Sequence, residues 1–244
     1  IIGDEAVMAA NMESGDIDAV DFFYDQNYID EFNANDDIVL YKIASQTQYI
    51  LYMNMQKEPF DNVKVREALC YAFDRDECID VLLNGDGFKT PTIVLPTQTF
   101  YRDGKIYDYN PEKSKEIMES VGCTMGEDGF YYRDGEKIGF VISVGAGDQV
   151  RLDIAQAAAQ QLKEVGIDYT VEVPTEVDWG GQMAYLIGWG SPFDADDHTY
   201  KVFGTDKGAN YSSYSNALVD QYLIEARESA DPAVRAEAYD KFQE

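Results

Sequence analysis

The residues of this chain best suited to chemistry lie between positions 185 and 200, in the stretch YLIGWGSPFDADDHTY. Asp194 and Asp196 precede His198, the single histidine of the chain, at alternating positions. In an extended segment, alternate residues point to the same side, so these three side chains have the spacing to ligate a metal ion. A Ser–His–Asp or Cys–His site also needs a histidine as its base, and that base has to be His198.

The rest of the sequence does not support either chemistry. No GxSxG nucleophile elbow occurs, and the three cysteines form no Cys/His cluster of the kind that binds zinc. The aspartates lack the glycine and the closing glutamate of an EF-hand loop. Because alternating aspartates are also common in plain acidic loops, we expect a solvated loop at 194–198. We assign no catalytic residue, no metal ligand and no cofactor.

Trp189 follows an apolar, strand-like run and lies between Gly188 and Gly190. A single tryptophan after a strand usually belongs to the core. Flanking glycines, however, leave room for a ligand backbone and suit an indole that forms a pocket wall. Physical reasoning alone leaves both interpretations open.

A second segment, SVGAGDQVR at 143–151, has the order strand, glycine turn, helix. It fits neither the GxGxxG fingerprint nor the P-loop, so a tight turn is the simpler interpretation. If the helix began beside a cleft, its N-terminus would be suited to a ligand carboxylate.

The charge balance excludes some partners. The chain has 46 acidic and 19 basic residues and a net charge of −27, with no basic stripe, which argues against nucleic acid and anionic membranes as partners. Its 244 residues are enough for one large domain or two modest ones. We expect Cys70, Cys78 and Cys123 to be buried thiols.

Hydrophobic spacing and capping residues predict alternating strands and helices. We expect helices at 4–14, 62–73, 75–83, 111–121, 148–165, 216–229 and 231–244, and strands at 17–20, 38–45, 49–55, 168–173 and 183–189, with a hairpin around Asp134-Gly135. This order predicts an α/β or α+β protein with a mixed sheet. The chain opens as if in mid-domain and stops within a helix, so we expect a piece of a longer protein.

Six segments, in series, resemble the family 5 extracellular solute-binding proteins of ABC importers. They are AVMAANMESGDIDAV, YILYMNMQKEPFDNVKVREALCYAFDRDECIDVLLNGDG, YDYNPEKSKEIMESVG, IAQAAAQQLKEVGIDYTVEV, GWGSPFDADD and YSSYSNALVDQYLIEARESADPAVRAEAYDKFQE. The likeness covers nearly the whole chain. The segment VDWGGQMAY is shorter than the family pattern, with Gln182 where an aspartate is usual.

The resemblance implies a type II periplasmic-binding-protein-like α/β lobe, with a mixed sheet flanked by helices, as part of a two-lobe clamshell. It implies that residues 1–48 are the tail of the first lobe, 49–55 a hinge strand and 56–244 the second lobe, truncated at its C-terminus. Closure of the two lobes would then bury the ligand.

The resemblance also implies ligand-binding residues. Trp189, Gly190 and Phe193 would line the cleft, and Asp194 would hold a peptide's amino group. Two residues of the hinge strand complete the implied set, Tyr52 and Asn54.

The implied function is the capture of small peptides, or a related solute, by a monomer that delivers them to membrane permease subunits. Its implied place is outside the cytoplasm, in the periplasm or as a cell-surface lipoprotein. One alternative is a nickel- or metal-complex-binding protein of the same family, although that branch uses a histidine that the region around Lys207 lacks. Others are an α/β hydrolase that uses His198 and a sensor module without transport.

Overall fold

The computed structural model describes residues 2, 4–20, 23, 25–43, 46–146, 149–190 and 194–244. The chain divides into two compact units, Ile1–Ser45 and Gln46–Glu244. The first unit contains helices α1 (Glu5–Ser14) and α2 (Gln26–Asn33).

The ends of α1 follow from its sequence, as predicted. The carboxylate of Asp4 accepts a hydrogen bond from the Val7 amide, and Gly15 ends the helix with a φ of 76°. In α2, the buried Phe32 packs edge-to-face on Phe23, with 5.0 Å between the ring centroids.

The strands predicted at 17–20 and 38–45 are wrong for the residues that the structure describes there, 17–20 and 38–43. Val39, Tyr41 and Ile43 are 70%, 84% and 84% exposed. Strand backbone groups need a neighbouring strand as hydrogen-bond partner, and the described part of this unit offers none. β-branched residues alone therefore do not make these segments strands.

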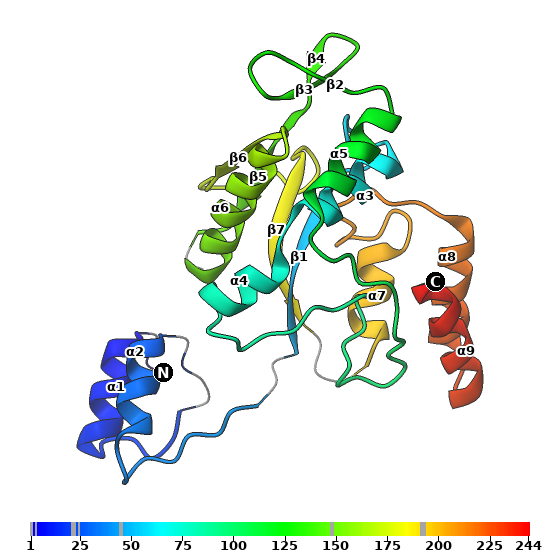
Figure 1. The fold of residues 1–244 in the computed structure, drawn as a ribbon. Coiled ribbons are helices and arrows are strands. Elements are labelled where there is room, and N and C mark those ends of the chain that lie inside the picture. Colours follow the sequence, from blue (N-terminus) through cyan, green and yellow to red (C-terminus); the bar gives the residue numbers. More distant parts are fainter. Residues whose placement is uncertain are drawn as a thin grey trace. The chain divides into compact units, whose positions relative to one another are not determined.

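The second unit is built on a four-stranded mixed sheet, as predicted (Figure 1). Its strands, in spatial order, are β1 (Thr47–Met53), β7 (Ala184–Gly190), β5 (Gly139–Val144) and β6 (Asp168–Glu172). β1 pairs antiparallel with β7, whereas β5 pairs parallel with both β6 and β7.

A smaller sheet combines β2 (Thr124–Met125), β3 (Tyr131–Arg133) and β4 (Glu136–Lys137). The predicted hairpin turn is confirmed between β3 and β4. Asp134 and Gly135 both have positive φ, 53° and 88°, as a two-residue type I′ turn requires.

The pairing of β1 with β7 divides their side chains between two faces. Tyr52 lies opposite Tyr185, and Gln48 lies opposite Trp189. Directly opposed residues of an antiparallel pair point to the same side, so these side chains share one face. Leu51 and its partner on β7, Leu186, share the other.

The face of Leu51 and Leu186 belongs to the main hydrophobic core. Four helices contribute to that core: α3 (Val63–Ala72), α4 (Arg75–Leu82), α5 (Pro111–Ser120) and α6 (Gln149–Glu164). The sequence allows either Asp61 or Asn62 as the cap of α3, and in the structure Asn62 accepts the hydrogen bond from a first-turn amide. The predicted cap of α5, Asn110, is confirmed and accepts a hydrogen bond in the same way.

The three cysteines are free thiols, as expected, and burial raises the pKa of each. Cys78 and Cys123 are buried, while Cys70 is half-buried.

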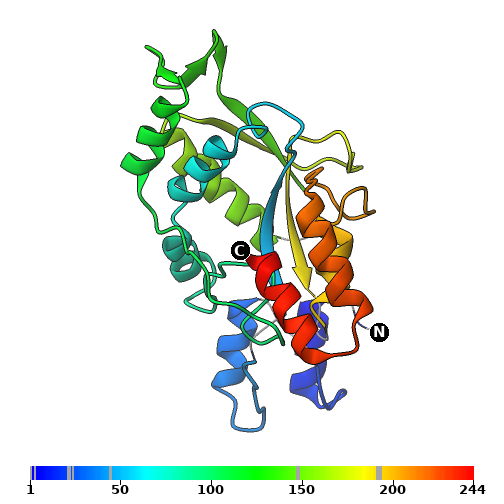
Figure 2. The ribbon, with the colours of Figure 1, turned by 90° about the vertical axis from the view of Figure 1, so that its right-hand side faces the viewer.

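The face of Tyr52 and Trp189 is covered by α7 (Asp196–Phe203), through Val202 and Phe203. Helices α8 (Ala217–Glu228) and α9 (Pro232–Gln243) pack beyond it and run side by side (Figure 2). The sheet thus lies between two helical layers.

The solvated loop predicted at 194–198 is wrong, because residues 196–203 form α7. Ala195, His198, Thr199 and Val202 are all buried, and their spacing is that of one helix face. In a helix, Asp196 and His198 no longer share a side. No group of three His, Cys, Asp or Glu side chains suited to a metal ion occurs among the described residues.

His198 is part of the packing of the second unit. The residue is 2% exposed. Its Nε2–H donates a hydrogen bond to the carbonyl oxygen of Ile93 over 3.0 Å, which joins α7 to the loop that contains Ile93. Burial lowers the pKa of His198, as does Lys201, whereas the Ile93 carbonyl and Asp197 oppose this shift.

In the part of the chain that the structure describes, no helix has both the length and the apolar composition needed to cross a bilayer.

The buried histidine predicts a defined pH dependence of stability. Its pKa is lower in the folded than in the unfolded chain, so the unfolded chain binds the proton more tightly. The stability that neutral His198 provides is therefore complete above about pH 6.5 and is lost as the pH falls below that value. In urea unfolding at several pH values, the free energy of unfolding of the wild type should fall relative to that of His198→Gln as the pH is lowered from about 7 to about 5. The carboxylates titrate in both proteins and cancel in the difference, so a pH-independent difference would contradict this account.

Candidate ligand-binding site

The carboxyl ends of β5 and β7 meet at one edge of the sheet. β1 starts at the same edge, because Thr47 lies opposite Gly190 in the antiparallel pair. In open α/β sheets, ligands bind outside the carboxyl ends of the parallel strands. We therefore take this edge, with Trp189 one residue before the end of β7, as the candidate site.

Trp189 is half-buried, so neither of the two interpretations left open by the sequence describes it alone. Its ring packs in a hydrophobic cluster with Val202 and Phe203 of α7, and the Nζ of Lys201 lies 5.3 Å from the ring centroid. Its Nε1 is buried and finds no hydrogen-bond acceptor among the described residues. The indole thus lies at the candidate edge half-exposed, with its Nε1 buried.

The absence of side chains at Gly188 and Gly190 leaves space that other parts of the protein occupy. A Cβ at Gly190 would lie 2.6 Å from the carbonyl oxygen of Gln46, a distance that side chains do not adopt. A Cβ at Gly188 would lie 3.2 Å from the guanidinium of Arg151 and 3.3 Å from the methyl of Thr47. The Gly-Trp-Gly sequence therefore allows β1 and Arg151 to approach closely, a reason that the sequence did not reveal.

Arg151 places a positive charge at this edge. It comes from the first turn of α6, and its guanidinium reaches between Gly145, which follows β5, and Gly188 of β7. The hydroxyl of Tyr185 lies beside it; burial raises the pKa of Tyr185 and Arg151 opposes that shift. Sequence reasoning noted the helix N-terminus but missed this arginine in its first turn.

Asp194 forms an ion pair with Arg235, a residue of the same chain. Its Oδ1 accepts a hydrogen bond from Arg235 of α9 at 2.5 Å and another from the Asp196 amide at 2.9 Å. The hydrogen bond from Arg235 is the main reason that the pKa of Asp194 is lowered. Asp194 thus joins the start of α7 to α9, and a ligand amine would have to compete with Arg235.

The two hinge-strand residues occupy different positions. Tyr52 is 4% exposed, has its ring 6.1 Å from that of Tyr211, and has a pKa raised mainly by burial. Asn54 lies beyond the other end of β1 from the candidate edge, where its Nδ2 donates to the carbonyl oxygen of Gln182 over 3.2 Å and its Oδ1 accepts from the Gln56 amide. The structure therefore does not bring Asn54 together with Trp189. Phe193 lies outside the described residues.

Trp189 belongs to an aromatic cluster that the sequence did not reveal. We use this name for Tyr52, Trp179, Tyr185, Trp189 and Tyr211. The ring of Trp179 lies 4.7 Å from that of Tyr185 and 4.5 Å from that of Tyr211, and Tyr211 lies 6.5 Å from Trp189. Trp179 is 40% exposed and comes from the helix-free connection between β6 and β7. These residues are far apart in sequence, so no spacing rule links them.

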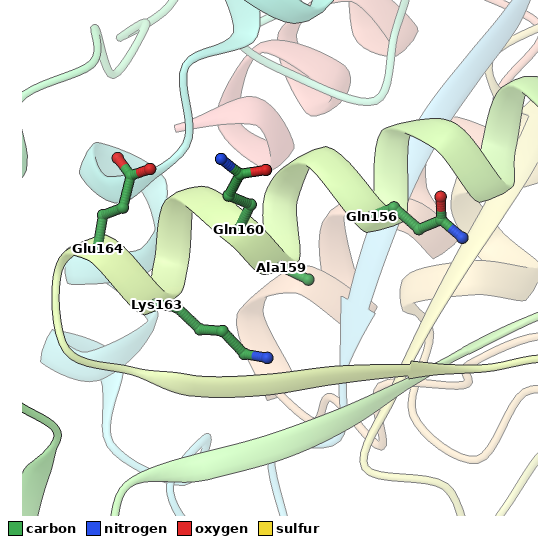
Figure 3. Close-up of a pocket in the computed structure, with 5 residues that line it drawn as sticks. All are labelled: Gln156, Ala159, Gln160, Lys163 and Glu164. Atoms are coloured by element: carbon green, nitrogen blue, oxygen red, sulfur yellow. The ribbon is translucent and has the colours of Figure 1, made fainter. Parts of the chain in front are cut away.

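A depression on the outer surface of α6 is not part of this site (Figure 3). Its five lining residues come from one helix, and their side chains diverge: Gln160 and Glu164 point to one side and Lys163 to the other. No set of groups converges there on a ligand.

Comparison with known proteins places this architecture in a family. Residues 1–211 match the description "Bacterial extracellular solute-binding proteins, family 5 Middle". The oligopeptide-binding protein AppA of Bacillus subtilis (strain 168) is 30% identical over 264 aligned residues, which cover 99% of this chain and 46% of AppA. The glutathione-binding protein GsiB of Escherichia coli (strain K12) is 28% identical over 260, covering 100% of this chain and 48% of GsiB.

Solved structures agree on the fold. NikZ from Campylobacter jejuni in complex with Ni(L-His) superposes with a TM-score of 0.86 at 28% identity, over 99% of this chain and 50% of NikZ. AppA from Bacillus subtilis in complex with a nonapeptide gives 0.81 at 25% identity, over 100% of this chain and 50% of AppA. The chain spans about half the length of the curated relatives it matches. The resemblance and the periplasmic-binding-protein-like α/β fold that it implied are confirmed, and the chain belongs to family 5 of the bacterial extracellular solute-binding proteins.

Proposed function

We propose that this protein is the substrate-binding component of an ABC importer that captures small peptides, or a related small solute, and delivers them to membrane permease subunits. One observation carries the proposal. Where β5 and β7 end, half-buried Trp189 and the rest of the aromatic cluster lie near the positively charged side chain of Arg151. The names of AppA and GsiB, binding proteins for oligopeptides and glutathione, support this ligand class.

The chemistry of the edge suits binding. Aromatic faces stack on flat or apolar ligand groups, and a guanidinium binds a carboxylate through paired hydrogen bonds. Backbone groups at strand ends hold a peptide main chain without regard to its side chains. We therefore propose capture without turnover. The hydrolase alternative needs His198 as its base, yet His198 is buried and bonded to Ile93.

The proposal includes a clamshell in which residues 1–48 are the tail of the first lobe, 49–55 the hinge strand and 56–244 the second lobe. Division of the chain between Ser45 and Gln46, just before β1, supports a hinge near this point. It also includes action as a monomer outside the cytoplasm, in the periplasm or as a cell-surface lipoprotein. Membership of a family of extracellular solute-binding proteins supports this location. The net charge of −27 argues against nucleic acid as a partner.

A metal complex is the second candidate ligand, and the structural likeness to NikZ, solved with Ni(L-His), favours it. The one histidine of this chain, His198, is 2% exposed. In this alternative, the imidazole ligands of the metal would therefore come with the bound complex.

Ligand-induced stabilisation of the full chain tests the proposal. We expect at least one of tri-alanine, penta-alanine, glutathione and nickel–L-histidine to raise the Tm, with about 2.7 kcal/mol of stabilisation at about 100 times its Kd. Trp189→Ala should lose about 2 kcal/mol of this effect, because the indole contacts the ligand. Phe88→Ala, a change at an exposed aromatic residue outside the cluster, is the control. No Tm change with any probe would refute the proposed function, and an unaltered effect in Trp189→Ala would refute the site.

The position of Arg151 predicts that affinity depends on a carboxylate in the ligand. Arg151→Gln should weaken tri-alanine binding about tenfold and leave tri-alanine amide almost unaffected, because the lost guanidinium faces a carboxylate. Isothermal titration calorimetry of both ligands checks this. Equal weakening of the two ligands would show that Arg151 acts on the fold rather than on the carboxylate.

Because Asp194 is paired with Arg235, we expect its substitution to reduce the stability of the protein and not its affinity for a ligand amine. Asp194→Asn removes the charged partner of Arg235 and should lower the free energy of unfolding by about 1 kcal/mol, since the pair is partly exposed. The ratio of affinities for tri-alanine and N-acetyl-tri-alanine should stay unchanged. If that ratio falls about tenfold, Asp194 holds the ligand amine, as the resemblance implied.

A further inference from the structure

Tyr211 is the residue that joins the aromatic cluster together. Its ring contacts those of Tyr52, Trp179 and Trp189, with centroid distances of 6.1, 4.5 and 6.5 Å. Tyr52 comes from β1, Trp179 from the β6–β7 connection and Trp189 from β7. Tyr211 is therefore the one member of the cluster whose ring contacts both tryptophans.

Tyr211 belongs to the turn of residues 204–214, which joins α7 to the segment before α8. This turn has no regular secondary structure, and Ser213 has a positive φ of 52°. The amide of Met55, two residues after the end of β1, donates to the Ser212 carbonyl oxygen over 2.8 Å and so ties the turn to the segment that follows β1. Within the turn, the amides of Lys207, Asn210 and Ser213 donate to the carbonyl oxygens of Gly204, Lys207 and Asn210, and side-chain hydrogen bonds join these short local turns to one another.

Asn210 makes four of these side-chain hydrogen bonds, which connect the two ends of the turn. Its Nδ2 donates to the carbonyl oxygens of Gly204 and Tyr214, over 3.0 and 2.8 Å. Its Oδ1 accepts from the Ser212 hydroxyl over 3.1 Å and from the Tyr214 amide over 3.0 Å. A carboxamide has two donor hydrogens and two acceptor lone pairs, and all four are used here.

We propose that Asn210 is a positioning residue of the ligand-binding site: its carboxamide fixes the turn of residues 204–214 and thereby holds Tyr211 against Trp179 and Trp189. The effect on ligand binding rests on the proposed function. The effect on the two indoles does not.

The chain offers a matched pair of substitutions. Asn210→Asp keeps the shape of the side chain, removes both donors and brings a carboxylate oxygen towards the carbonyls of Gly204 and Tyr214. Asn216→Asp adds the same charge six residues later. The capping hydrogen bonds of Asn216, from the amides of Leu218 and Val219, are accepted by Oδ1, so an aspartate preserves them.

The fluorescence of single tryptophans reads out the position of Tyr211, because the chain has two tryptophans. In a Trp179→Phe background of the full chain, Asn210→Asp should increase acrylamide quenching of Trp189 about twofold, as the Tyr211 ring that contacts the indole moves away. It should also weaken the binding of tri-alanine, glutathione or nickel–L-histidine, whichever stabilises the wild type, about tenfold. Asn216→Asp should change neither quantity.

Two further variants keep the test decisive if Asn210→Asp folds poorly. Tyr211→Phe retains the ring and should behave as the wild type, whereas Tyr211→Ala should reproduce the effects expected of Asn210→Asp. Unchanged quenching in Asn210→Asp or Tyr211→Ala, or equal effects of Asn210→Asp and Asn216→Asp, would overturn the inference. If no probe stabilises the wild type, the proposed function fails, and the quenching series still tests the position of Tyr211.

Discussion

The antiparallel pairing of β1 with β7 brings together residues 47–53 and 184–190, which are far apart in the chain. Its register places Tyr52, Tyr185 and Trp189 on one face and leaves the other face for the core beneath α6. A shift by one residue would exchange the two faces and bury Trp189 beneath the main helical layer. The missing Cβ of Gly190 permits this pairing, because a side chain there would collide with Gln46.

The two helical layers then give the candidate edge its chemistry. From one side, α6 contributes the guanidinium of Arg151. From the other, α7 contributes Lys201 beside Trp189. In a chain with a net charge of −27, these two side chains place positive charge at this edge of the sheet, as the proposed binding of a ligand carboxylate requires. The aromatic cluster adds apolar faces to the candidate site.

Several polar residues that first suggest chemistry serve the fold instead. His198 joins α7 to the loop that contains Ile93, and Asp194 joins α7 to α9 through Arg235. Both interactions are partly or wholly withdrawn from water, where hydrogen bonds to charged or buried groups contribute most. The same helix α7 packs against Trp189, so these contacts hold in place a helix that lies beside the candidate site.

The sequence by itself determined the features that depend on neighbours in the chain. Helix caps at Asp4, Asn62 and Asn110, the turn at Asp134-Gly135, the mixed α/β class and the family follow from local patterns. Local patterns failed where a partner distant in sequence decides the outcome. The segment at 38–43 has strand-forming residues but no neighbouring strand in the described part of its unit.

Only the tertiary structure decided which residues lie together at the candidate site. It gave Asp194 a cation from α9, buried His198, separated Asn54 from Trp189 and added Arg151, Trp179 and Tyr211. The buried spacing of Ala195, His198, Thr199 and Val202 was visible in the sequence as a helix face, but the aspartates between them obscured it. The physical reason is that strand pairing and side-chain contacts join groups whose separation along the chain carries no information about their distance in space.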